Sequence, residues 1–221
     1  MATNPGPNDF LQEAKNRLRW PMLLVIFLWI IQGFQFLVHG QLGALGIYPH
    51  HLSGLKGIFF APLIHGSCGH LISNTIPLFV LTLILAVFYK RVALISFILI
   101  YLGTGLAVWL FARPVYHIGA SGVVYGLLSF VFWSGVFRRN IRSIVLALIV
   151  TILYSGFIWG VLPVKEGISW ESHLFGAIVG ILVAFLFRHS IDPDEETRYS
   201  YEEDEPTDER YFFDRDTFDR H

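Results

Sequence analysis

Acidic residues are missing from most of this chain: no aspartate or glutamate occurs between Glu13 and Glu166. Their absence excludes a His-Glu-x-x-His zinc site and a pair of catalytic aspartates from that stretch, because both need carboxylates. It also removes the carboxylate that would complete a Ser-His-Asp triad there. Any serine chemistry in this part of the chain therefore has to rely on a dyad.

Cysteine and charge are scarce as well. The one cysteine, Cys68, rules out a disulfide framework within the chain and a Cys-x-x-Cys metal pattern. Only 15% of the 221 residues are charged and 54% are hydrophobic, a balance that soluble domains do not show. We interpret the chain as an integral, multi-pass membrane protein in contact with membrane lipid, and we expect no nucleic-acid partner.

Six predominantly apolar stretches approach the roughly 20 residues that cross a bilayer core of about 30 Å. They are 21–38, 70–89, 92–112, 121–137, 142–161 and 171–187. None alternates with the period of a barrel strand, and lipid leaves no backbone polar group unpaired, so these spans should be helices. No Ala-x-Ala cleavage site follows the first stretch, which we interpret as a retained span and not a signal peptide.

The fold class predicted is an all-α membrane protein, a bundle of six transmembrane helices over residues 21–190. Residues 1–20 would form a cytoplasmic N-terminal segment. Residues 191–221 would form an acidic, disordered cytoplasmic tail, since residues 192–221 hold 13 acidic residues against 4 basic ones. Residues 40–64 are too polar and too broken by glycine and proline to span, and we expect them in or on the outer leaflet.

Basic residues orient the predicted bundle. With a cytoplasmic N-terminus, nine Lys or Arg residues lie on the inner side and only Lys56, Arg113 and Lys165 lie on the outer side. The positive-inside bias places both termini in the cytoplasm, and we expect a bacterial inner (plasma) membrane. Glu166 and Glu171 are then interpreted as charges of an outer loop.

Three even-numbered spans carry polar groups at one depth. Asn74, Ser121 and His173 lie 15 to 17 residues before the basic residue that ends each span. At about 1.5 Å per residue, they stand about 23 to 26 Å from the inner boundary. Polar groups inside spans are costly, so this coincidence favours a functional site built between helices.

Ser121 lies between Gly119 and Gly122, which allow a sharp turn that begins a helix and leaves the hydroxyl exposed. Unpaired N–H groups at the helix start would stabilise an oxyanion. The alternative is a Gly/Ser packing face, which is common in membrane helices.

His173 is the candidate general base for Ser121. It shares a helix face with Gly176 and Gly180, a small-residue face that lets another helix approach closely. If that helix is the one carrying Ser121, the imidazole reaches the hydroxyl, and Tyr125, one turn further, packs on the ring. The alternative is a histidine with a structural role.

His70 and Asn74 are four residues apart and share one face of their span. Both side chains donate hydrogen bonds, which suits the second half of an oxyanion hole. A metal site formed by His65, His70 and His173 is the alternative, although such a site wants three or four converging ligands.

The combined motifs resemble the rhomboid family of intramembrane serine proteases. The resemblance rests on the order and spacing of three motifs over about residues 20–190: His65-x4-His70-x3-Asn74, Gly119-x-Ser121-Gly122-x2-Tyr125 and His173-x2-Gly176-x3-Gly180. Many relatives also carry a Trp-Arg pair in the first outer loop, and residues 54–58 here do not.

The resemblance implies that Ser121 is the nucleophile and His173 the base. It further implies an oxyanion hole formed by His70, Asn74 and the Ser121 N–H, with Tyr125 packed on His173. His65 would be structural, ordering the first outer loop.

The expected function is therefore an intramembrane serine endopeptidase that cleaves transmembrane protein substrates near the outer face, without a cofactor. Two other classes remain. A non-proteolytic scaffold of the same fold would bind membrane helices, although such a protein should lack Ser121 or His173. A transporter would need a polar path across the membrane, and the inner halves of the six spans offer only scattered Ser and Thr.

Overall fold

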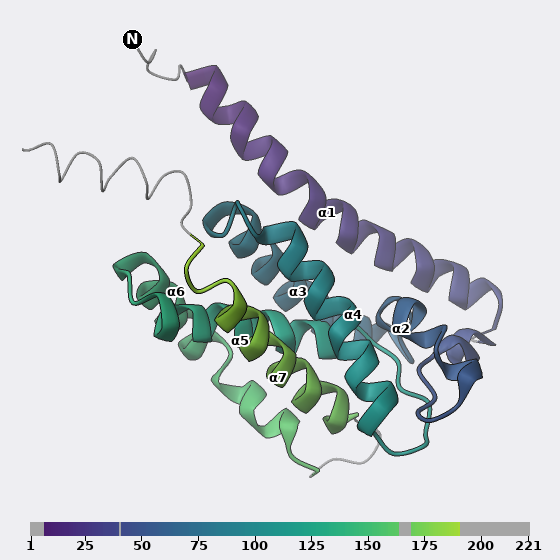
Figure 1. Cartoon of the computed structure of the whole chain (residues 1–221). Coiled ribbons are helices and arrows are strands. Elements are labelled where there is room, and N and C mark those ends of the chain that lie inside the picture. The colour runs from purple at the N-terminus through teal and green to yellow at the C-terminus, as the bar shows by residue number, and fades with distance from the viewer. Residues whose placement is uncertain (1–6, 40, 164–168, 191–221) are drawn as a thin grey trace, which may run out of the picture. The chain divides into compact units, whose positions relative to one another are not determined.

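The computed structural model describes residues 7–39, 41–163 and 169–190 of the 221-residue chain. Within these residues the protein is helical, with one isolated β-bridge and no strand, so the predicted all-helical class is confirmed there. The elements, shown in Figure 1, are α1 (Pro7–Leu37), η1 (Gln41–Leu45), η2 (Leu52–Gly54), α2 (Gly57–Phe60), η3 (Ala61–Leu63), α3 (Cys68–Phe88), α4 (Ala93–Phe111), α5 (Ser121–Arg138), α6 (Ile141–Leu153), η4 (Ser155–Val161) and α7 (Trp170–Leu186). The predicted disordered tail, 191–221, lies outside the described residues.

Four helices of the described part are long and apolar enough to cross a membrane: α1 from Lys15, α3, α4 and α5. The bent pair of α6 and η4 makes a fifth if it counts as one span, while α7 is apolar but has only 17 residues. The bounds of α3, α4 and α5 lie within two residues of the predicted spans. The count of six spans and the orientation of the termini stay predictions.

The first helix is longer than the sequence indicated. α1 begins at Pro7 and runs through most of the segment predicted to precede the membrane. Arg17 pairs with Glu13 one turn earlier, and its guanidinium donates to the Ala86 carbonyl at the end of α3, 2.9 Å away. The basic residues before the first span thus belong to α1, and one of them also satisfies a free carbonyl at the end of α3.

The predicted fifth span, 142–161, is not one straight helix. The chain bends by 71° between α6 and η4, at Tyr154. Two weak helix formers, Gly156 and Gly160, follow the bend. Two carbonyls of η4, those of Phe157 and Gly160, accept hydrogen bonds from side chains of α5 and α7 in place of bonds within a continuous helix.

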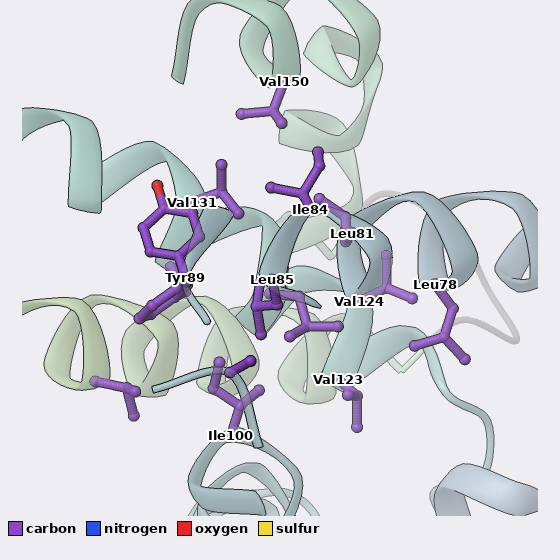
Figure 2. Close-up of a cluster of buried hydrophobic side chains, with 14 of the residues drawn as sticks. Leu78, Leu81, Ile84, Leu85, Tyr89, Ile100, Val123, Val124, Val131 and Val150 are labelled. Carbon is purple, nitrogen blue, oxygen red and sulfur yellow. The ribbon is translucent and has the colours of Figure 1, made fainter. Parts of the chain in front are cut away.

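The centre of the bundle is α5, which packs against α3, α4, α6 and α7 (Figure 1). Leucines on one face of α3 meet valines of α5 in the main hydrophobic cluster, and Ile100 of α4 and Val150 of α6 close it from two sides. Figure 2 shows these side chains converging around Leu85. Apolar burial alone holds helices together weakly in lipid, so the closeness of packing matters.

Glycines bring α5 and α7 into backbone contact. A Cβ atom added at Gly176 would lie 2.1 Å from the carbonyl oxygen of Gly122, and one at Gly180 would lie 2.1 Å from that of Gly126. No side chain fits in either place, so the small-residue face that the sequence predicted for this helix packs on α5. This contact sets the distance between Ser121 and His173, which stand near the ends of the same two helices.

Gly176→Val should lower the stability of the bundle by at least about 1–3 kcal/mol, because the new side chain would force α5 and α7 apart. Gly33→Val in α1 is the matched control, since nothing lies within 4 Å of a Cβ there. Thermal unfolding in one detergent compares the two variants. Equal melting temperatures for Gly176→Val and the wild type would contradict the packing described here.

Candidate active site

A cavity of about 670 Å³ lies at the end of the bundle where α5 and α7 begin. Its walls come from α3, the α4–α5 connection, α5, η4 and α7. They include five of the predicted site residues, namely His70, Asn74, Ser121, Tyr125 and His173. Residues about 100 positions apart in the sequence thus meet around one hollow.

A hydrogen bond at the wall of the cavity joins Ser121 and His173. Ser121 is the first residue of α5 and His173 stands in the first turn of α7, with its ring nitrogen Nε2 2.8 Å from the serine Oγ. His173 is only 7% exposed. The two side chains can therefore share a proton in surroundings largely shielded from solvent.

The other ring nitrogen of His173 fixes which tautomer the neutral imidazole adopts. Nδ1 lies 2.8 Å from the carbonyl oxygen of Gly160 in η4, and a carbonyl can only accept, so Nδ1 carries the proton. Nε2 is then the lone-pair nitrogen that faces Ser121. Tyr125 stacks on the same ring, with centroids 4.1 Å apart and planes 8° from parallel.

Gly119 shapes the approach to Ser121. It adopts a φ of +108° that L side chains rarely take, and its N–H donates to the Ala61 carbonyl 2.8 Å away. A Cβ at this position would also lie 2.6 Å from a carbon of the His70 ring. The glycine thus permits both the turn before α5 and the approach of the His70 ring to that turn.

Two kinds of hydrogen-bond donor lie at the wall of the cavity. The N–H of Ser121 opens a helix and has no acceptor within it. Across the cavity, Asn74 donates one amide hydrogen to the His70 carbonyl at 3.1 Å, which orients the amide. Its second amide hydrogen can be donated to another acceptor. The side chain of His70 borders the same cavity.

His65 supports the backbone just before Ser121. It is fully buried, and its Nε2 accepts a hydrogen bond from the Ala120 N–H over 3.2 Å, while its own carbonyl accepts one from Gln35. Burial, and next the neighbouring His70, lower the pKa of His65 from 6.5 to about 4. Protonation of Nε2 would also remove the bond to Ala120.

Acidification should destabilise the fold through His65. A histidine whose pKa is lower in the folded state contributes stability that is complete above its unfolded pKa of 6.5 and is lost as the pH falls toward 4. Between about pH 7.5 and about pH 5 the loss should be about 2 kcal/mol. His65→Gln keeps an acceptor and does not titrate, so its melting temperature should fall less over this range. Identical pH profiles would exclude the effect.

Glu171 differs from the prediction that made it a charge of an outer loop. It lies in the first turn of α7 and is 4% exposed, with its carboxylate 2.7 Å from the Arg113 guanidinium. The arginine pair explains how an acid can be buried there. Glu166, the other acid of that prediction, lies outside the described residues.

A series of hydrogen bonds beside this ion pair links the α4–α5 connection to the start of α7. His117 Nδ1 is 2.5 Å from the Ser169 hydroxyl, which is 2.7 Å from that of Ser172. His117 is also bridged to Ile47 in the loop after α1, and burial lowers its pKa. Sequence reasoning missed this group, although a histidine two residues before Gly119 was a signal that could have suggested it.

The alternative of a three-histidine metal site is not assembled. Over the described ranges, no group of three His, Cys, Asp or Glu side chains could hold a metal ion. The rings of His65 and His70 touch edge to face, with centroids 5.1 Å apart, and both nitrogens of His173 are engaged by Ser121 and Gly160.

Comparison with known proteins matches residues 52–190 to the family model of the Rhomboid domain. Uncharacterized proteins of Mycobacterium tuberculosis and Mycobacterium bovis are each 35% identical over 195 residues, which make up 81% of this chain and 81% of the relative. An uncharacterized protein of Mycobacterium leprae is 33% identical over 201 residues, 84% of this chain and 78% of that protein. The match to the Rhomboid domain covers more than half of the chain and includes the whole cavity.

Proposed function

This chain belongs to the rhomboid family and is an integral membrane protein, and we propose that it is an intramembrane serine endopeptidase. Ser121 is the nucleophile and His173 the general base. The observation that carries the proposal is the 2.8 Å contact between Ser121 Oγ and the lone-pair nitrogen of His173. A half-buried serine paired in this way with a buried histidine has the geometry of an activated nucleophile.

The reaction follows the acyl-transfer route. Ser121 Oγ attacks a peptide carbonyl carbon while its proton passes to His173 Nε2, and a tetrahedral intermediate with a negative oxygen forms. The C–N bond then breaks and His173 gives the proton to the leaving amine. Water then attacks the acyl carbon while its proton passes to His173 Nε2. The bond between that carbon and Ser121 Oγ breaks, His173 returns the proton to Oγ, and the carboxylic acid leaves. The mechanism needs no metal and no cofactor.

The oxyanion is stabilised by the Ser121 N–H, the second amide hydrogen of Asn74 and the His70 side chain. The first lies at the positive end of α5, and the others reach the cavity from α3. Donors fixed before the reaction stabilise developing charge without reorganising.

The substrate is the transmembrane segment of another protein. Ser73 of α3 and Phe157 of η4 stand among the cavity's lining residues, so the hollow extends between a long helix and the short segment η4. A substrate helix must unwind partly there, because its peptide bonds are hydrogen-bonded and shielded while helical. With both termini in the cytoplasm, cleavage takes place near the outer face of the membrane, which we take to be the bacterial inner membrane.

The rival function is a scaffold that binds membrane helices without cutting them. Reconstituted full-length protein and a substrate with one transmembrane segment decide between the two. The protease should release two fragments whose new ends, determined by mass spectrometry, fall within or beside the hydrophobic stretch. A substrate that co-purifies with the wild type and stays intact would favour the scaffold.

Chelators should leave the cleavage rate within about twofold of the untreated rate, since the serine route needs no metal. The assay compares the reconstituted protein before and after dialysis against EDTA. Activity that is lost on chelation and restored by zinc would overturn the serine mechanism in favour of a metal-dependent one.

A further inference from the structure

Two carbonyls of the short segment η4 bond to the two aromatic rings at the centre of the site. The Tyr125 hydroxyl donates to the Phe157 carbonyl over 2.8 Å, and His173 Nδ1 donates to the Gly160 carbonyl over 2.8 Å. The same two rings stack on each other. η4 therefore holds the stacked pair at both of its polar ends.

The Gly160 carbonyl is available because of the residue three positions later. In a 3₁₀ segment such as η4, a carbonyl bonds to the N–H of residue i+3. For Gly160 that residue is Pro163, which has no N–H. The carbonyl is thus left for a partner outside its own segment, and His173 Nδ1 supplies the donor.

Close approach explains why this position is a glycine. A Cβ atom at residue 160 would lie 1.8 Å from the Tyr125 hydroxyl oxygen and 3.1 Å from His173 Nδ1. By contrast, a Cβ at Gly156, in the same segment, would meet nothing within 4 Å. The two glycines of η4 thus differ sharply in what they tolerate.

We infer that η4 is the positioning element of the catalytic base, with the Gly160 carbonyl in the role that a carboxylate has in a Ser-His-Asp triad. This inference rests on the proposed function and assigns its third group to a backbone atom. The chain has no acid between Glu13 and Glu166, and Glu171, the buried acid nearby, pairs with Arg113.

The role has two parts. In the resting state the carbonyl keeps the proton on Nδ1, so that Nε2 faces Ser121 as a base. When His173 takes the serine proton, the ring becomes cationic and its bond to the Gly160 carbonyl strengthens. If η4 moved away, both contributions would be lost together with the Phe157 bond to Tyr125.

Variants of the two glycines test the inference. Gly160→Ala should lower kcat at least tenfold and change KM little, because the ring pair is displaced while the rest of the cavity stays. The matched control Gly156→Ala should retain at least half of the wild-type kcat. Adding Tyr125→Phe to Gly160→Ala removes the oxygen nearest to the new Cβ and should restore part of the lost rate.

The tautomer supplies a readout that does not depend on activity. In protein with ¹⁵N-labelled histidine, the signal of His173, assigned by its loss in His173→Ala, should report a protonated Nδ1 and a bare Nε2 at neutral pH. Gly160→Ala should weaken this preference. An Nε2-protonated wild type, or a Gly160→Ala variant with wild-type kcat and tautomer, would overturn the inference.

These results also separate the inference from the proposed function. If the wild type failed to cleave, the proposed function would fail whatever the tautomer. If the wild type cleaved and Gly160→Ala cleaved equally well, only the role of η4 would fail. If Gly160→Ala does not fold, the tautomer of His173 in the wild type still tests the role of η4.

Discussion

Ser121→Ala should abolish cleavage, with a fall in kcat of at least about 1,000-fold, as expected when the nucleophile of a serine hydrolase is removed. The variant lacks the Oγ atom that would form the acyl-enzyme, and no other hydroxyl is bonded to His173 Nε2 in the described part of the chain. Alanine fits at the first position of α5 and removes one oxygen from a half-buried side chain at the cavity wall, so the bundle should fold normally.

The measurement is single-turnover cleavage of a transmembrane substrate by wild type and variant at equal folded concentration. Ser129→Ala, which removes a hydroxyl two turns further along α5, is the matched control and should stay within about twofold of the wild type. Cleavage by Ser121→Ala at a rate near that of the wild type would mean that another group is the nucleophile.

His173→Ala should reduce kcat as severely as Ser121→Ala, because the serine then has no base to take its proton. Groups that act as a unit are not additive, so the double variant Ser121→Ala/His173→Ala should be no slower than either single variant. His189→Ala, past the far end of α7, is the control and should cleave normally. A double variant much slower than both singles would show that the two residues act independently.

Much of this fold could be predicted because its signals are local. Apolar length located α3, α4 and α5 to within two residues. The spacing of Gly176 and Gly180 predicted a close helix contact, and α7 does pack on α5 through them. The positions of Ser121 and His173 along their spans predicted that the two residues lie at the same depth. In the structure, Ser121 Oγ and His173 Nε2 are 2.8 Å apart. Their catalytic roles stay predictions.

What could not be predicted depends on contacts between distant segments. Nothing in the sequence around Gly160 signals that its carbonyl meets an imidazole 13 residues further on. The bend at Tyr154 could not be predicted, because it lies in an apolar stretch long enough to be one span. The hydrogen bonds that hold the segment after the bend come from side chains of α5 and α7. Glu171 was assigned to a loop because its partner, Arg113, is 58 residues away, a pairing that no periodicity can indicate.

The length of the first helix also could not be predicted from the local sequence. Its extension before residue 21 contains Arg17, whose guanidinium donates to the Ala86 and Val87 carbonyls at the end of α3. A sequence pattern marks such an arginine only as a basic flank of a span. The sequence therefore predicts only that Arg17 flanks a span, while its contact with the end of another helix is visible only in the packed bundle.

The most direct test of the central claim is labelling of the reconstituted protein by a fluorophosphonate, followed by mass spectrometry of its peptides. Fluorophosphonates react with serines that are activated as nucleophiles, so the reagent reports the proposed chemistry without a known substrate. We predict one phosphonylated residue, Ser121, and loss of the label in His173→Ala. A label on a different residue, or a protein that cleaves its substrate while Ser121 stays unmodified and the reagent does not inhibit, would contradict the account.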